Sequence, residues 1–510
     1  MSGGDCELSP LSVVALLPLK MIIDMVNEFR TTRQVCRRWR TLIPEGRLTI
    51  SSKVTDDALR SLEPLQHVQR LTMAQCARLT DDGAAQLTQC RSLVAIALTN
   101  NANVGLQTVM ALCSLKTLRR VNLYMCTAIN DAMVMHLCTL TQLERLILTG
   151  AKITNRSVAI IAQALPLMGD LELGHANEAE HALSITDSAV ARLAGLEQLT
   201  SLILNGCAVT DRSVHNFSSL TNLLNLGLSH ACGSRPISAG AITTLASHCT
   251  RLTHVSLNGA QIDASGVRSL CRAARALRAL QLNNNLLLDD EAVAHACSLP
   301  KLELLWIGGM HNPTLLTDSA VRALGDVAST LEDLHLDCGT FSPNSVGYLS
   351  SLRQLTAITL EGTGLFLLPD DAAAWELVTL SFPALSHFQL MDTVISAAHM
   401  ESIATRVTSI RCLHLHACDV SDEVARLLSR NEKLEHLELH GGAMEPGALG
   451  HFTRLTRLES LLLSDFDAVD ADELEVLGNL SLTQLELHNT SVDDRDQVAH
   501  LAGTVTVFFH

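Results

Sequence analysis

Aromatic side chains are scarce in this 510-residue chain, where they make up only 3% of the sequence. Because 47% of the residues are hydrophobic, the chain has enough apolar side chains for an extensive core, and this core must be aliphatic. Positive charge is also in short supply: 37 Lys and Arg stand against 53 Asp and Glu, which gives a net charge of −16. Nucleic acid is therefore not expected as the main partner, because phosphate binding needs a basic surface.

Paired cysteine motifs and long apolar runs are missing as well. The 15 cysteines include no C-x-x-C pair, which argues against zinc ribbons and dithiol redox motifs. Their odd number and their scatter along a long chain predict free thiols, not disulfides, and therefore a reducing compartment. The longest early apolar stretch, Leu11 to Leu19, contains Pro18 and fits neither a secretory signal nor a membrane span. The sequence predicts a cytoplasmic protein that does not contact a membrane.

Motifs of catalysis are absent from the sequence. It contains no phosphate-binding loop of the G-x-x-x-x-G-K-[ST] type and no G-x-S-x-G, H-E-x-x-H or G-x-G-x-x-G motif. The carboxylate pairs Asp289-Asp290 and Asp493-Asp494 precede helical segments, where capping of the helix N-terminus is the expected role. We therefore predict that the chain is not an enzyme, has no catalytic residues and needs no cofactor.

An internal repeat dominates the sequence and determines the predicted fold. The phrase Leu-x-x-Leu-x-Leu-x-x-(Cys, Asn or small) recurs at spacings from 24 residues (Leu199 to Leu223) to 31 residues (Met168 to Leu199). Its seventeen copies begin at Val68, Leu93, Leu118, Leu143, Met168, Leu199, Leu223, Leu252, Leu277, Leu302, Leu331, Leu355, Leu385, Ile410, Leu434, Leu458 and Leu482.

The second half of each copy also repeats. Phrases such as Ile185-Thr-Asp-Ser-Ala-Val and Val209-Thr-Asp-Arg-Ser-Val place Thr, Ser or Asp before a run with helical periodicity, which is an N-cap signal. Each copy is therefore interpreted as a short strand, a turn and a capped helix. With cysteines at the turn (Cys76, Cys126, Cys207), the pattern resembles the cysteine-containing leucine-rich repeats, in which the small thiol packs inside the turn.

Stacking of these repeats follows from their energetics. One copy buries about five aliphatic side chains, worth about 10 kcal/mol, whereas ordering its backbone costs at least about 25 kcal/mol. Burial against both neighbours must supply the difference. We predict an α/β fold, a right-handed leucine-rich-repeat solenoid (horseshoe) with parallel strands on the concave face and helices on the convex face. Residues 504–509 are expected to form a final strand that caps the stack.

The first residues have a different pattern. Two amphipathic helices are predicted before the repeats. Their Leu17-Pro18 start, Ile22-Ile23 core and Val35-Cys36-Arg37-Arg38-Trp39 ending resemble an F-box placed directly before leucine-rich repeats. The resemblance implies a division into an F-box-like helical segment, 1–47, and a solenoid, 48–510. It also implies that the segment binds a Skp-type adaptor, and through it a cullin, with Leu17, Pro18, Ile22, Ile23, Val35, Cys36 and Trp39.

The spacing within this segment departs from the F-box pattern. Only 16 residues separate Pro18 from Val35, which shortens the region where an F-box forms its middle helix. Two helices that merely cap the apolar end of the solenoid are the alternative interpretation. Loss of adaptor binding would accompany either a strongly shortened F-box or a plain cap.

The concave face is the predicted binding surface. Strand side chains alternate, so the third, fifth and seventh positions of each repeat point into this groove. We predict that these positions bind a protein partner, and that the main contacts come from Arg70, Arg120, Tyr124, Arg145, Leu304, Trp306, His335, His387, His414, His416, His436, Glu438 and His440.

Histidine is enriched at these groove positions. In-register stacking is expected to place His416 beside His440, Cys412 beside His436, and His414 next to Glu438, about 4.8 Å apart. Such pairs suggest either zinc binding or pH-sensitive binding. Because a flat ladder closes poorly around an ion, we predict no metal in this group.

Trp306 is the strongest single candidate for partner binding. A large aromatic side chain on a face with few aromatics is typical of a binding hot spot, although it can instead pack under the insertion at 308–316. The family resemblance then leaves two functions open. One is a substrate receptor of a cullin-based ubiquitin ligase; the other is a scaffold subunit, as in the nexin–dynein regulatory complex of the ciliary or flagellar axoneme.

Overall fold

The computed structural model is organised into two units, residues 1–185 and 186–510. Each unit is built from repeats in which a short strand is followed by a turn and a helix. The residues that the structure describes are 47–50, 56, 68–76, 79–174, 185–230, 237–309, 315–327, 329–337, 346–349, 351–361, 384–391, 401, 410–416, 418–467, 469–480, 482–492 and 506–509.

In the first unit, consensus leucines alternate with polar residues along each strand. In β2 (Arg70–Ala74), Leu71 and Met73 are buried, whereas Arg70 and Thr72 are exposed. The other strands are β1 (Arg47–Ile50), β3 (Ala95–Thr99), β4 (Arg120–Asn122), β5 (Arg145–Ile147) and β6 (Asp170–Glu172). The described helices are α4 (Asp81–Ala84), η3 (Ala85–Gln89), α5 (Leu106–Ser114), α6 (Asp131–Leu137) and α7 (Asn155–Ala164).

The second unit continues the same plan. Its strands are β7 (Ser201–Ile203), β8 (Asn225–Gly227), β9 (His254–Ser256), β10 (Ala279–Asn283), β11 (Leu304–Gly308), β12 (Asp333–Asp337), β13 (Ala357–Glu361), β14 (His387–Met391), β15 (Cys412–His416), β16 (His436–His440), β17 (Ser460–Ser464), β18 (Gln484–His488) and β19 (Thr506–Phe509). Its described helices are α8 (Asp187–Val190), η4 (Ala191–Gly195), α9 (Asp211–Asn216), η5 (Phe217–Ser219), α10 (Ala239–His248), α11 (Ala264–Ala273), α12 (Asp290–Cys297), α13 (Asp318–Val327), α14 (Val346–Leu349), α17 (Asp422–Leu428), α18 (Leu449–Phe452), α19 (Ala471–Glu475) and η8 (Val476–Asn479).

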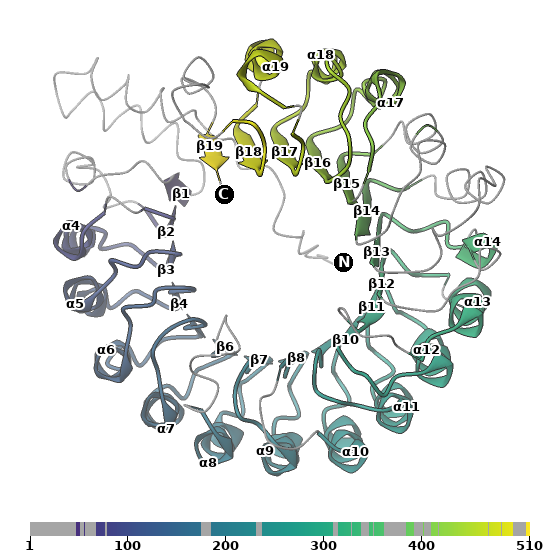
Figure 1. Ribbon diagram of the computed structural model, residues 1–510. Helices are drawn as coiled ribbons and strands as arrows, with labels where there is room; N and C mark the ends of the chain where they lie inside the picture. Colours follow the sequence, from purple (N-terminus) through teal and green to yellow (C-terminus); the bar gives the residue numbers. More distant parts are fainter. Residues whose placement is uncertain are drawn as a thin grey trace, which may run out of the picture. The chain divides into compact units, whose positions relative to one another are not determined.

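The pairing of these strands confirms the predicted α/β solenoid. Within each unit, consecutive strands pair in parallel and in register, as in Leu71 with Ile96 and Leu413 with Leu437. Figure 1 shows the strands on the inner side and the helices on the outer side of each unit. Each of the seventeen repeats supplies one strand, and β19 is the predicted final strand. The strand β1 was not predicted from the sequence, and it pairs with β2.

The turn after each strand explains the Cys or Asn of the repeat phrase. The eighth position adopts a left-handed backbone, with φ of 54° at Asn100 and 62° at Asn284. The next residue points into the turn. There the amide of Asn285 donates to the Leu257 carbonyl of the preceding repeat at 2.8 Å, and the Cys126 thiol donates to the Leu98 carbonyl. These bonds satisfy buried backbone groups between repeats.

Several of the predicted helix caps are present, although Thr186 makes no side-chain cap bond to α8, and acidic side chains beside them also join neighbouring repeats. Thr210 caps α9, and the carboxylate of Asp187, in the preceding repeat, accepts hydrogen bonds from the Thr210 N–H at 2.9 Å and hydroxyl at 2.6 Å. Burial raises the pKa of Asp187, but the hydrogen bonds from Ser213 and Thr210 outweigh it and lower the pKa overall. Asp289 caps its own helix as expected, whereas Asp290 reaches the next repeat and binds Thr317.

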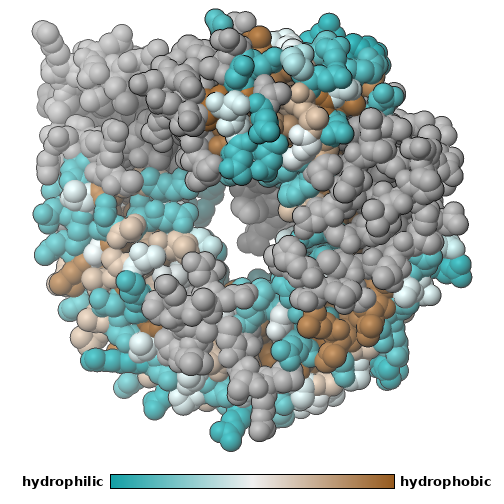
Figure 2. Space-filling model, in the orientation of Figure 1, coloured by the Kyte–Doolittle hydropathy of each residue, from teal (hydrophilic) through white to brown (hydrophobic). Residues whose placement is uncertain are grey.

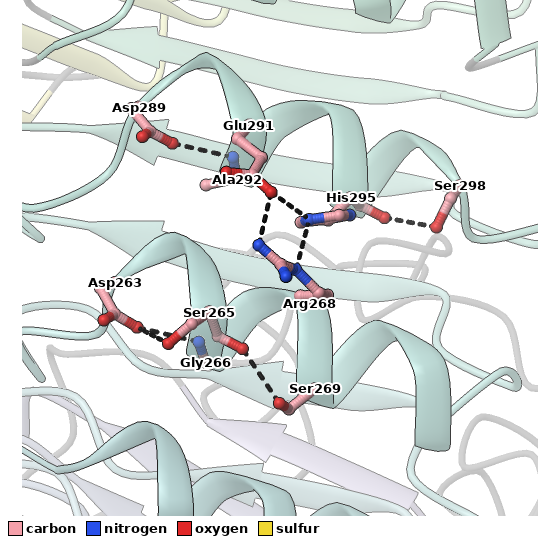
Figure 3. A network of polar contacts seen from close by, with 10 residues as sticks. All are labelled: Asp263, Ser265, Gly266, Arg268, Ser269, Asp289, Glu291, Ala292, His295 and Ser298. Atoms are coloured by element: carbon pink, nitrogen blue, oxygen red, sulfur yellow. Dashed lines mark hydrogen bonds and ion pairs between the residues drawn. The ribbon is translucent and has the colours of Figure 1, made fainter.

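Polar contacts also link the helices on the convex side. Figure 3 shows Arg268 of α11 beside Glu291 and His295 of α12, with the Arg268 guanidinium 2.5 Å from the Glu291 carboxylate. Asp263 and Asp289 accept hydrogen bonds at the starts of these two helices. Since these ion-paired side chains are largely exposed, they contribute little stability compared with the buried leucines beneath them.

Several predicted features lie outside the described residues. These are the F-box-like residues Leu17, Pro18, Ile22, Ile23, Val35, Cys36 and Trp39, the pair Asp493-Asp494, and residues 310–314 of the insertion at 308–316. The division at residue 47 therefore stays a prediction. Among the described helices, none is long and apolar enough to cross a membrane.

Candidate functional site

The concave face of the first unit carries the predicted basic side chains. Arg70, Arg120 and Arg145 are exposed at the third position of their repeats, and Tyr124 lies exposed at the seventh position of the repeat that contains β4. Arg145 is engaged by a neighbour, because its Nε lies 3.1 Å from the Asp170 carboxylate on β6. This part of the face therefore offers a row of exposed guanidinium groups.

Trp306 lies on the concave face of the second unit, as predicted. Its side chain is half-buried at the fifth position of the repeat that contains β11, and Leu304 is half-buried at the third position of that repeat. The indole N–H donates to the Asp333 carboxylate on β12 at 3.0 Å, and the ring centroid lies 6.0 Å from that of His335. Contacts with the next strand thus orient the ring. Residues 310–314 of the neighbouring insertion lie outside the described part.

Asp333 occupies the third position of its repeat, which the sequence predicts to face the groove, and its environment is unusual. Burial raises the pKa of its carboxyl, while the hydrogen bond from Trp306 acts in the opposite direction. A carboxylate held at the edge of an indole ring supplies a fixed hydrogen-bond acceptor beside an apolar surface. This pairing was not predicted, because it depends on the side-chain conformations of Trp306 and Asp333.

Next to Trp306, a group of three polar side chains joins β12 to β13. His335 faces Glu361, with His335 Nε2 at 3.5 Å from a carboxylate oxygen, and Asp337 stands in register with Glu361. The ligand atoms of the three side chains all lie within 4.8 Å of one another. Asp337 and Glu361 are buried, at 0% and 8% exposure. Their positions on the face were predicted, but their burial was not.

The predicted histidine pairs are present on β15 and β16. Cys412 pairs with His436, and His414 with Glu438, in the strand register. His414 Nδ1 lies 3.1 Å from the Glu438 carboxylate. The rings of His416 and His440 stack, with centroids 4.2 Å apart. We name the group His414, His416, His436, Glu438 and His440 the histidine ladder.

Burial lowers the pKa of two histidines of the ladder, His414 and His440. Burial first, and then nearby histidines such as His436, lower the pKa of His414 to about 4. The pKa of His440 falls to about 4 through burial and its neighbours His416 and His488. Both rings are neutral at pH 7. Burial also raises the pKa of Cys412 to about 11, so this thiol is not a thiolate ligand at neutral pH.

Exposed leucines form a separate feature outside the strands. Leu286 and Leu287 follow β10, and Leu315 lies in the corresponding segment after β11; all three are at least half exposed. Figure 2 shows a hydrophobic patch in this region, near α11 and α12. Because these side chains belong to the turns, they are not part of the concave face.

Comparison with known proteins agrees with the repeat pattern. Residues 322–507 match the family described as "FBD-associated F-box protein At5g56370, LRR repeats". No curated protein matches the chain.

Among solved structures, an internalin (inlF) of Listeria monocytogenes is 18% identical and covers 73% of this chain and 82% of its own, with a TM-score of 0.37. A Leptospira interrogans LRR protein is 16% identical and covers 91% and 100%, with a TM-score of 0.36. The yeast Rad7 and Elc1 complex yields a match at 16% identity, covering 75% and 94%, with a TM-score of 0.46. The repeated strand, turn and helix identify the chain as a leucine-rich-repeat protein, and residues 322–507 are similar to the repeats of an F-box-associated family.

Proposed function

We propose that this chain is the substrate receptor of a cullin-based ubiquitin ligase, with its partner protein bound on the concave face of the second unit. Leucine-rich-repeat solenoids are protein-interaction modules whose strand face forms an extended binding surface. The match of residues 322–507 to an F-box-associated family supports the connection with a ligase. The chain has no role as an enzyme in this proposal; it recognises the protein that the ligase modifies.

The concave face around Trp306 carries the proposal. Trp306 offers an aromatic surface of which only part is exposed, with its N–H already bonded to Asp333. Polar groups flank it along the same rows, through His335 and His387 to the histidine ladder. A half-buried aromatic ring surrounded by polar side chains is the usual arrangement of a binding hot spot and its rim.

Replacement of Trp306 tests the partner-binding role. We expect Trp306→Ala to weaken partner capture at least about tenfold, as hot-spot truncations do, without unfolding the protein. Met135→Ala is the matched control, because Met135 is an exposed apolar residue on the helix side of the first unit, on α6. The measurement is the dissociation constant for a partner recovered with the wild-type chain. An unchanged constant for Trp306→Ala contradicts the role.

The adaptor half of the proposal depends on the N-terminal segment. Co-purification of the full chain with a Skp-type adaptor and a cullin is the direct test, and Ile22→Asp is expected to abolish their recovery because it places a charge in the predicted apolar contact. Trp306→Ala serves as the control here, since it should leave adaptor recovery unchanged.

Failure to recover adaptor and cullin with the wild-type chain contradicts the ligase role. The scaffold function in a ciliary or flagellar axoneme stays the alternative prediction. Retention of the chain with cytoskeleton through salt extraction, without adaptor, would favour that alternative.

A further inference from the structure

We propose that His335, Asp337 and Glu361 form a zinc-binding site on the concave face of the second unit. Within the described residues, these three potential metal ligands converge from two adjacent strands, β12 and β13, with all ligand atoms within 4.8 Å of one another. We call them the His-Asp-Glu cluster. The inference does not depend on the proposed ligase function.

The two carboxylates provide the electrostatic reason for a cation. Asp337 and Glu361 are partners in the strand register and are both buried. Two carboxylates that share a buried site repel each other, and each loses hydration. A divalent cation between them compensates both charges at once. The neighbouring imidazole of His335 adds a nitrogen ligand to the pair.

The geometry lies close to that of a zinc site. Zinc takes nitrogen from His and oxygen from Asp or Glu at about 2.0–2.2 Å, which places tetrahedral ligand atoms roughly 3.3–3.6 Å apart. His335 Nε2 and the Glu361 carboxylate are already 3.5 Å apart, and this Nε2 is buried and makes no hydrogen bond. Since all three ligand atoms lie within 4.8 Å of one another, shifts of about an ångström bring them to tetrahedral spacing.

The strand packing around Asp337 limits its freedom. A Cβ atom at Gly308 on β11 would stand 2.2 Å from the Asp337 Cβ, so this position of β11 has no room for any side chain. Gly308 thus lets Asp337 lie directly against the β11 backbone. The leucines on either side of the cluster, Leu336 and Leu360, are buried and hold both strands in register. A carboxylate positioned in this way loses little entropy when it binds an ion.

The donor types favour zinc over other common cations. Mg²⁺ and Ca²⁺ prefer coordination entirely by oxygen, whereas imidazole together with carboxylate suits zinc. Three protein ligands leave a fourth position for water or for a side chain of a bound partner. The objection that a flat ladder closes poorly around an ion is weaker here than for the histidine ladder, because two of the three ligands are carboxylates that are buried together.

Metal binding to the purified chain tests the site. The full-length protein is prepared without a histidine tag, stripped with a chelator and titrated with zinc against a chromophoric chelator, and its metal content is measured by mass spectrometry. We expect one equivalent of zinc with a dissociation constant of about 1 μM or tighter. Glu361→Gln and Asp337→Asn should each weaken zinc binding at least about 30-fold, because even the loss of a group that only orients a metal ligand typically costs 10–100-fold in affinity.

His440→Gln is the matched control, because it removes a histidine of the same face at the seventh position of another repeat. Its zinc affinity should equal that of the wild type. Circular dichroism reports whether each variant is folded. If Asp337→Asn does not fold, Glu361→Gln and the visible spectrum of Co²⁺ bound to the wild type decide the question. Absence of stoichiometric metal, or equal losses in Glu361→Gln and His440→Gln, overturns the site.

Discussion

Two groups of side chains in the second unit occupy equivalent positions but differ in charge. The His-Asp-Glu cluster takes the fifth and seventh positions of the repeat that contains β12 and the seventh position of the repeat that contains β13. In the histidine ladder, His414, His416 and His440 take the same three positions of β15 and β16. The backbone register is identical in the two places, so the difference between them comes from side-chain chemistry alone.

The comparison shows how a repeated scaffold supports opposite electrostatics. Two buried carboxylates in the first group favour a cation, whereas the rings of His414 and His440 in the second group resist protonation. The pKa of His414 and that of His440 both fall to about 4, chiefly through burial. A solenoid can therefore change the binding properties of its face by substitutions at a few positions, with no change in the strands that carry them.

The strongest way to sharpen this comparison is to convert one group into the other. The double substitution His416→Asp/His440→Glu gives the ladder the same ligand set as the His-Asp-Glu cluster, with His414 as the nitrogen ligand. If register and ligand type suffice, the variant gains a second zinc equivalent. A micromolar affinity corresponds to about 8 kcal/mol of binding free energy.

The measurement is zinc stoichiometry in the wild type and in the double variant. The expected change is from one to two equivalents. A control variant, His416→Asn/His440→Gln, has the same shape without the charges and should stay at one. A second equivalent in the control would show that charge is not the deciding property.

The buried leucines beneath the two groups should contribute equally to the stability of the protein. Leu336 lies between His335 and Asp337, Leu415 lies between His414 and His416, and both leucines are fully buried. We expect Leu336→Ala and Leu415→Ala each to lower the free energy of unfolding by about 2–5 kcal/mol through lost burial and a remaining cavity. Urea denaturation at pH 7.5 measures this. A loss of unfolding free energy outside that range in only one of the two variants would mean that the two backbone sites are not equivalent.

A smaller effect is expected from pH. His414 and His440 have a pKa of about 4 in the folded protein, below the ordinary histidine value of 6.5. Below pH 6.5 these two histidines bind protons in the unfolded chain but not in the folded chain. Their contribution to the free energy of unfolding is therefore fully present above pH 6.5 and is lost progressively as the pH falls towards 4. With allowance for the partial exposure of both rings, the loss from pH 7.5 to pH 5 is about 2 kcal/mol.

This loss should be specific to the ladder. Burial raises the pKa of Glu438, which binds its proton more readily in the folded state and opposes the loss in part. We expect His414→Gln/His440→Gln to flatten the dependence of unfolding free energy on pH, measured by urea denaturation at several pH values. An unchanged slope would place the pH sensitivity elsewhere in the chain.

The sequence predicted the strands and their register because the leucine pattern has a fixed period. The pairs His416 with His440 and His414 with Glu438 followed from that period alone. The His-Asp-Glu cluster was missed because the same pattern does not say how deeply a seventh-position side chain is buried. That depth depends on the neighbouring residue, here Gly308, whose missing side chain admits Asp337.

The carboxylates that cross between repeats have a consequence for assembly of the chain. Asp187 binds the start of the helix that follows in the next repeat, and Asp290 does the same for the helix that begins after Thr317. In translation, each acceptor leaves the ribosome before the amide and hydroxyl donors that it receives. When a new repeat emerges, the carboxylate that accepts its hydrogen bonds is already present in the preceding repeat. The repeats can therefore fold onto one another in the order of synthesis.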